Sequence, residues 1–224
     1  MRKVGFTLAE VLITLGIVGV ISAMAIPGLI NTYRANAYKS QLFKSYSIIK
    51  QVNRKILDDI SPERYTAHGY YKTFLKYLQG ATDCSSGYDK NSFPCYYTRG
   101  ENEPYKNLTG STRMTTTFLD DGQIAMPDGT LLMFENQGSD NVTPIYIFVD
   151  LNGYGKLPNR LGVDLFAFQL VNDEILPMGA IGTDFPNPDK QCSKNGSDPN
   201  NGMACTKKAL SDPNYFKSML SGLK

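Results

Sequence analysis

The sequence is poor in the residues and motifs on which catalysis usually depends. It has a single histidine, His68, so a catalytic triad would have to take its base from that residue. It contains no GxSxG nucleophile turn, no glycine-rich phosphate loop and no HExxH zinc motif. His68 stands beside Gly69 in a stretch that we expect to be a surface loop. The sequence therefore favours a structural or binding protein over an enzyme.

An excess of charge of one sign is also missing. The formal net charge is +2, and Arg2 and Lys3 account for it, so the rest of the chain is neutral. No overall basic field points to nucleic acid as a partner. Basic residues nevertheless gather, without any acid, between positions 31 and 57: Arg34, Lys39, Lys44, Lys50, Arg54 and Lys55. Such a face is usually solvated, although anionic headgroups or acidic neighbours also fit it.

The chain has one long apolar run. From Val11 to Ile30 no residue is charged, and only Thr14 and Ser22 have polar side chains. At 1.5 Å per residue the run is about 30 Å long, the thickness of the hydrocarbon core of a bilayer. Glu10 stands at its head, where a carboxylate is costly unless it finds a partner. We therefore expect a membrane-spanning helix in which Glu10 has a specific function.

Two ordinary explanations of this N-terminus remain open. A secretory signal peptide also begins with basic residues, and Ser22–Ala25 would serve as its cleavage site, but the apolar run is too long for such a peptide. A plain membrane anchor would account for the length of the run. Neither explanation says why Gly5, Phe6 and Glu10 stand where they do.

The stretch Gly5-Phe6-Thr7-Leu8-Ala9-Glu10, followed by the apolar run, resembles the processing site of type IV prepilins and type II secretion pseudopilins. These proteins share a short basic leader that ends in glycine, an aromatic first mature residue and a glutamate four residues after it. Pro27 also falls where many of them have a helix-kinking proline. The resemblance extends to the end of the apolar run.

The resemblance implies a processing scheme. A prepilin peptidase in the bacterial inner membrane would cut between Gly5 and Phe6, and the new amino group of Phe6 would be methylated. The leader would comprise residues 1–5 and the membrane and assembly helix residues 6–30. Residues 31–224 would form a globular pilin-like head that includes the second half of the long helix.

The resemblance also implies a role for Glu10. It would pair with the Phe6 ammonium of a neighbouring subunit, because a charge in apolar surroundings is tolerated beside an opposite one. The partners would be other subunits of a type IV pilus, competence or type II secretion filament, and the large head favours a minor pilin or pseudopilin. Whether the head binds DNA or a secreted substrate is not readable from the residues. A membrane-anchored extracytoplasmic binding module is the alternative.

The basic residues after Ile30 create a conflict in topology. The positive-inside rule alone would place the C-terminal side in the cytoplasm, because that side carries more lysine and arginine than the N-terminal side. Long domains, however, cross membranes largely regardless of charge, and an even number of cysteines favours an oxidising compartment. We therefore expect a single-pass protein with its head outside the cytoplasm.

The helical pattern continues beyond the apolar run. Apolar residues recur at three- and four-residue steps: Tyr38, Leu42, Tyr46, Ile49, Val52 or Asn53, and Ile56. We expect one helix from Phe6 to Asp58 that ends before Ser61-Pro62. Pro27 should bend or loosen it, because proline removes one backbone hydrogen bond.

The sequence of the rest of the head predicts a short helix followed by a sheet. The helix is expected over Tyr70–Leu78. Six β runs follow, separated by turn signals such as the hairpin pair Asn172-Asp173: Met114–Leu119, Gln123–Met126, Thr130–Glu135, Ile145–Asp150, Leu165–Val171 and Glu174–Pro177. The predicted fold is α+β, with the long helix packed on an antiparallel β-meander.

The four cysteines favour disulfides over a zinc site. Cys84, Cys95, Cys192 and Cys205 include no pair with the short spacing that zinc sites usually show. Three connectivities are possible, and we choose the local pairs, Cys84 with Cys95 and Cys192 with Cys205. The second loop resembles the disulfide-bounded C-terminal region of type IV pilins. In the chain-closure model, a disulfide that closes a loop of this size stabilises the folded state by about 3 kcal/mol.

One turn-rich stretch, Phe148 to Asp164, partly matches a calcium loop. Asp150 and Asn152 fit its first and third positions, but Leu161 stands where a bidentate glutamate is needed. Asp164 would have to close the site from the next strand. We expect no cofactor, with calcium at Asp150, Asn152 and Asp164 as a weak candidate. The alternative is a glycine-rich turn whose aspartate and asparagine side chains bind the backbone.

Overall fold

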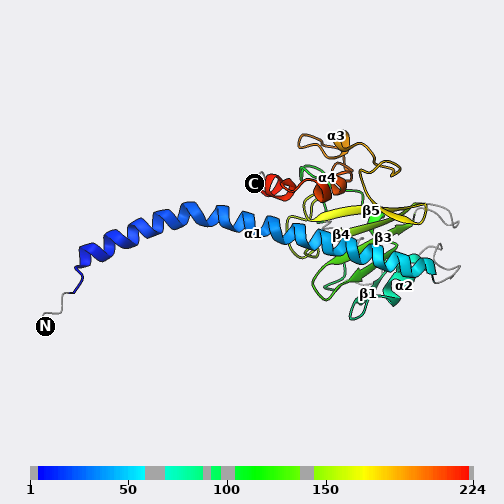
Figure 1. Ribbon diagram of the computed structural model, residues 1–224, viewed down its shortest axis with the longest axis horizontal. Coiled ribbons are helices and arrows are strands. Elements are labelled where there is room, and N and C mark those ends of the chain that lie inside the picture. The colour runs from blue at the N-terminus through cyan, green and yellow to red at the C-terminus, as the bar shows by residue number, and fades with distance from the viewer. Residues whose placement is uncertain (1–4, 59–68, 88–91, 97–103, 137–143, 222–224) are drawn as a thin grey trace.

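The computed structural model describes five stretches of the chain: residues 5–58, 69–87, 92–96, 104–136 and 144–221. Within them a long N-terminal helix projects from an α+β head (Figure 1). Arg2, Lys3, the expected helix end Ser61-Pro62 and His68 lie outside the described residues.

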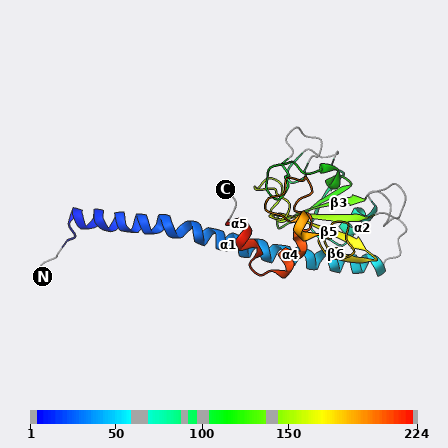
Figure 2. The same ribbon diagram turned by 90° about the horizontal axis from the view of Figure 1, so that it is seen from above.

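The helix α1 runs without interruption from Leu8 to Asp58, which is 51 residues or about 75 Å at 1.5 Å per residue. Its N-terminal half is exposed, and its C-terminal half lies along the head (Figure 1 and Figure 2). The residues of this second half that are buried follow the predicted helical stripe: Ala35, Leu42, Ser45, Ile49, Val52, Asn53 and Ile56. Tyr38 and Tyr46 pack at the edge of the same core.

Six antiparallel strands form one sheet in chain order. They are β1 (Thr82–Ser85), β2 (Gly122–Ala125), β3 (Leu131–Asn136), β4 (Ile145–Asp150), β5 (Leu165–Val171) and β6 (Glu174–Pro177). The predicted meander is therefore confirmed. The bounds of β4, β5 and β6 are those read from the sequence, and β2 and β3 are each displaced by one residue.

One predicted strand is wrong and one was missed. Thr116–Leu119 forms the 3₁₀ helix η2, where the strand Met114–Leu119 was expected. Its apolar residues Phe118 and Leu119 both pack against the second core, whereas consecutive residues of a strand point to opposite faces of a sheet. β1 escaped prediction because its sequence, TDCS, has only Cys84 as an apolar residue and lies at the sheet edge.

Both faces of the sheet are covered. One face packs against α1, α2 (Gly69–Lys76), α4 (Cys205–Ser211) and α5 (Tyr215–Leu220). The other face forms a second core with loop residues that include Tyr96, Tyr105 and Met203. All residues of β3 and β4 are buried as a result. Their sequences are accordingly near-continuous apolar runs instead of alternating ones.

A tight hairpin turn joins β5 to β6 and also contacts α1. Its residues Asn172 and Asp173 have positive φ angles of 48° and 64°, as the predicted two-residue turn requires. Asn53 of α1 donates from Nδ2 to the Asp173 carbonyl at 2.8 Å. The hydroxyl of Tyr70 in α2 donates to Asn53 Oδ1 at 2.9 Å. One buried amide therefore fixes α1 to both the hairpin and α2.

Two disulfides close the local loops that the cysteine spacing predicts. Cys84 pairs with Cys95, and Cys192 pairs with Cys205, with Cα–Cα distances of 5.3 and 5.0 Å. The second bond joins the end of α3 (Pro188–Gln191) to the first residue of α4. The C-terminal helices were not predicted, because even the longest, α4, has only 7 residues and shows too little of a helical period.

The second disulfide should contribute measurably to the stability of the head. Replacing both Cys192 and Cys205 by alanine is expected to lower the free energy of unfolding by about 3 kcal/mol, because the reduced unfolded chain gains loop entropy. Urea unfolding of the full-length protein in detergent measures this change. The Cys84→Ala, Cys95→Ala double variant is the matched control and should lose a similar amount. Peptide mapping that finds four free thiols would contradict both pairings.

Candidate assembly site

The expected cleavage point lies in a non-helical segment ahead of α1. Gly5, Phe6 and Thr7 have no helical structure, and α1 begins at Leu8. Phe6 is 90% exposed. The Gly5–Phe6 peptide bond therefore lies outside the helical hydrogen-bond ladder, where a protease is able to bind the backbone on both sides of it.

Glu10 has a partner within its own chain. Its Oε2 accepts hydrogen bonds from the backbone N–H and from the hydroxyl of Thr7, both at 2.8 Å. In return the Glu10 backbone N–H donates to Thr7 Oγ1 at 3.3 Å. This reciprocal arrangement is a capping box, which satisfies two backbone donors at the start of a helix. The single chain thus stabilises the Glu10 carboxylate before any neighbour arrives.

Thr7 is a functional candidate that the sequence reading missed. The signal was present, because a threonine followed three residues later by a glutamate, just before an apolar run, is the pattern of a capping box. The same glutamate therefore has a local role as well as the expected intermolecular one.

The exposed half of α1 has the properties of a membrane span. A window of 18 residues has a mean hydropathy of 2.2, and none of it is buried in the head. Pro27 lies inside the helix, which continues through it. Figure 1 shows α1 curving in this exposed half, and proline is a common cause of such a bend. By length and composition α1 is therefore able to cross a bilayer.

Residues 2–26 match the family model of the prokaryotic N-terminal methylation motif. The chain carries a prepilin-type leader. This leader is that of type IV pilin and pseudopilin precursors, and the long helix on an antiparallel sheet is a pilin-like arrangement. No curated protein and no solved structure matches the chain.

Polar contacts fix the prepilin-type helix to the head. Lys44 Nζ lies 2.6 Å from Asp128 Oδ2, and Gln41 Nε2 donates to the same oxygen at 2.9 Å. Burial would raise the pKa of Asp128, but the hydrogen bonds from Lys44 and Gln41 outweigh it and hold the pKa well below its usual range. Tyr46 stacks on Phe168 of β5 with ring centroids 5.1 Å apart. The head is thus held in a fixed position on α1.

Of the calcium candidates, the two aspartates have hydrogen-bond donors, whereas the buried Oδ1 of Asn152 has none among the described residues. Asp150 accepts from the N–H groups of Asn152 and Gly153 and from the Tyr105 hydroxyl. Asp164 accepts from the N–H groups of Asn159 and Arg160, at 2.9 and 2.7 Å. Burial raises the pKa of both aspartates. These contacts are those of a turn held by its aspartates, and calcium at Asp150, Asn152 and Asp164 stays a prediction.

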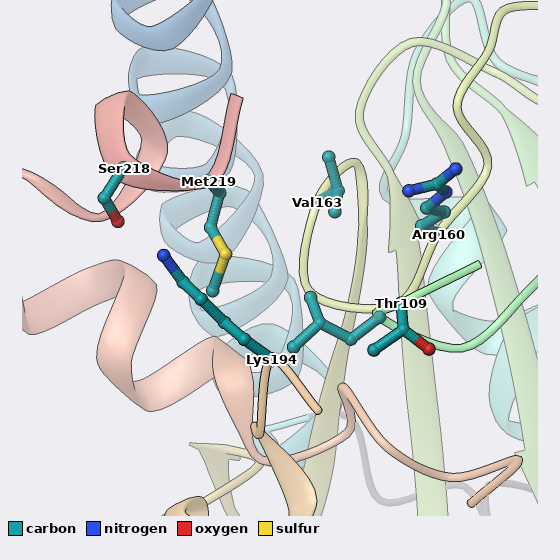
Figure 3. A pocket seen from close by; sticks show the side chains of 7 residues that line it. Thr109, Arg160, Val163, Lys194, Ser218 and Met219 are labelled. Atoms are coloured by element: carbon teal, nitrogen blue, oxygen red, sulfur yellow. The ribbon is translucent and has the colours of Figure 1, made fainter. Parts of the chain in front are cut away.

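A small pocket lies between the C-terminal helix and the loops at the end of the sheet. Its volume is about 170 Å³, and its lining includes Lys194, Met219 and Arg160. Figure 3 shows Lys194 reaching toward Ser218 and Met219, whereas Arg160 lies on the far side of Val163. The two cations therefore do not converge on one point, and the pocket lacks the geometry of an anion site.

The capping box predicts a specific effect of Thr7. Thr7→Val keeps the side-chain shape but removes the hydroxyl, so the N-terminal turn of α1 should lose about 1 kcal/mol. Hydrogen–deuterium exchange of the Glu10 and Val11 amides in detergent micelles should then become about fivefold faster. Thr7→Ser keeps the hydroxyl and should exchange like the wild type. Equal exchange in all three proteins would show that the box does not form.

Proposed function

We propose that this protein is a minor pilin or pseudopilin, a structural subunit that prepilin peptidase processes and that assembles through α1 into a type IV pilus, competence or type II secretion filament. The observation that carries the proposal is the prepilin-type leader at residues 2–26, joined to an exposed, non-helical Gly5–Phe6 bond and an uncovered apolar helix. The large head favours a minor subunit.

Processing would change the charge at the start of the helix. Hydrolysis of the Gly5–Phe6 bond by water leaves a carboxylate on the released leader and an ammonium on Phe6. Methylation of that amine keeps its positive charge. The mature chain would therefore have a cation four residues before Glu10, at the same end of the apolar helix.

Assembly would then be an exchange of partners for Glu10. In the free chain its carboxylate accepts two hydrogen bonds from Thr7. In a filament the Phe6 ammonium of a neighbour would supply a full opposite charge within apolar surroundings, where such a pair is strongly coupled. Since each Glu10 would take one neighbour's amine, the pairing would also set how far one subunit is displaced along the filament from the next.

The head would lie outside the cytoplasm of a single-pass inner-membrane protein. Two disulfides support an oxidising compartment. Three of the six basic residues that conflict with the positive-inside rule have partners. Lys44 pairs with Asp128 of the head, Lys50 lies 5.4 Å from the ring of Tyr46 in α1, and Lys55 lies 5.8 Å from the ring of Tyr77. These lysines therefore contribute to the packing of α1 and the head as well as to the charge of the surface.

The processed protein should begin at Phe6. Mass spectrometry of protein extracted from membranes is expected to find Phe6 as the first residue, with a methylated amino group. Gly5→Val should block cleavage while leaving the apolar helix intact, and thus accumulate the full-length form in the membrane. A mature start near Ile26 would instead restore the signal-peptide explanation.

Incorporation into filaments should depend more on the charge of the side chain at position 10 than on its size. Glu10→Gln keeps the volume and the helix propensity but leaves the neighbour's ammonium without an opposite charge, a loss of about 3–5 kcal/mol for a broken buried pair. Incorporation into sheared filaments, measured by co-purification, should fall sharply, whereas processing and membrane insertion should survive. Glu10→Asp keeps the charge and should be less affected.

Thr7→Val is the control that separates assembly from helix capping, because it weakens the capping box and retains the carboxylate. It should assemble far better than Glu10→Gln. Wild-type incorporation of Glu10→Gln would rule out an assembly role for this residue and favour an anchored binding module.

A further inference from the structure

Three carboxylates converge where the sheet meets η2, far from the N-terminal site. The ligand oxygens of Asp120, Asp121 and Glu135 all lie within 4.8 Å of one another. Asp120 caps the end of η2, Asp121 precedes β2, and Glu135 belongs to β3. Within the described stretches no other three acidic, histidine or cysteine side chains converge in this way.

The strand register forces this proximity. Gly122 pairs with Phe134, so Asp121 lies beside Glu135 one step further along the antiparallel ladder. The Asp121 N–H donates to the Phe134 carbonyl at 3.1 Å, and the Asn136 N–H donates to Asp121 Oδ2 at 2.8 Å. Opposed side chains on neighbouring strands lie about 5 Å apart, and like charges there destabilise a sheet unless something offsets them.

Glu135 has an oxygen that the described residues leave unsatisfied. The residue is only 9% exposed, and among the described residues its buried Oε2 has no hydrogen-bond partner. Its cross-strand neighbour on β4, Tyr146, donates its hydroxyl to Asp184 instead. A buried polar atom without a partner is rare in a folded protein, and a bound water or ion is one way in which such an atom is satisfied.

The charges of the group favour a bound cation. The buried carboxyl of Glu135 lies beside two other carboxyls, those of Asp120 and Asp121. The described neighbours that act on this carboxyl therefore all disfavour its anion. A bound divalent cation would offset both the burial and the repulsion, because it would be the largest charge in its surroundings.

We propose that Asp120, Asp121 and Glu135 bind a calcium ion. Carboxylates are the oxygen ligands that calcium prefers, and calcium accepts irregular arrangements of about six to eight oxygens, whereas magnesium demands near-octahedral geometry. The three carboxylates are fixed by the end of η2 and by the β2–β3 ladder, so they have little freedom to form an octahedron. Waters or backbone carbonyls would supply the remaining ligands.

Calcium titration of the full-length protein in a nonionic detergent tests this site. After treatment with EDTA, the wild type is expected to bind one calcium ion per chain, with a Kd of about 10⁻⁴–10⁻³ M as in extracellular calcium modules. Its unfolding temperature should rise with calcium, since the ion binds the folded state. Glu135→Gln should weaken binding by at least about tenfold, the effect that loss of even an outer-sphere partner can have.

Two controls locate the ion. Glu174→Gln makes the same change at an exposed glutamate of β6 and should bind calcium like the wild type. Asn152→Ala alters the Asp150–Asp164 turn and should also bind normally. If Glu135→Gln fails to fold, Asp121→Asn provides the same test.

Three outcomes would overturn the site. The first is that the wild type binds no calcium up to about 10 mM, which is ten times the weakest expected Kd. The second is that Glu135→Gln binds calcium as well as the wild type does. The third is that the wild type binds magnesium as tightly as calcium. A loss of binding in Asn152→Ala alone would move the ion to the Asp150–Asp164 turn. None of these results depends on the proposed role in filament assembly.

Discussion

The fold and the proposed assembly both depend on α1 remaining one helix while its two halves lie in different surroundings. Among the described residues the N-terminal half has no core to pack against, so its stability must come from backbone hydrogen bonds and from an apolar environment. The C-terminal half is held by the stripe from Leu42 to Ile56 and by polar contacts to the head. A rigid second half transmits any movement of the first half to the whole head. The register of the helices in a filament would therefore determine the arrangement of the heads.

The capping box gives a physical reason why Glu10 can serve both a single chain and a filament. A carboxylate left alone in apolar surroundings would be too costly for a stable free subunit. The two hydrogen bonds from Thr7 lower that cost, and they also begin the helix two residues after Phe6. If the same oxygen bound a neighbour's ammonium, the contribution of Glu10 to the free energy of assembly would be the difference between its interactions with the two partners. That difference would be smaller than either interaction alone, so the free subunit and the assembled one would both hold this carboxylate.

Local patterns in the sequence were sufficient for most of the fold. The helical stripe, the strands β4 to β6 and the Asn172-Asp173 turn depend on periodicity and turn chemistry that neighbouring residues already specify. The prediction for η2 was wrong because consecutive apolar residues also fit a buried strand, and only the tertiary structure brings Phe118 and Leu119 into one core. β1 was missed because TDCS carries almost no apolar signal. The second core was not foreseen, since it is built from loops that show no period. In the N-terminal site, Gly5, Phe6 and Glu10 form a motif that the sequence shows directly. The hydrogen bonds between Thr7 and Glu10 correspond to the sequence pattern of a capping box.

The buried carboxylates of the head lie in two kinds of surroundings. Asp150 and Asp164 stand in a glycine-rich turn whose sequence partly matches a calcium loop, and the fold directs backbone N–H groups at their oxygens. Glu135 stood in an ordinary apolar strand and gave no signal. Its partner Asp121 is 14 positions away and reaches it only through the β2–β3 register. Backbone donors from a turn already stabilise a carboxylate, so a metal would add less there. A buried carboxylate that the sheet pairs with another acid would gain more from a bound cation, because the cation would offset their repulsion.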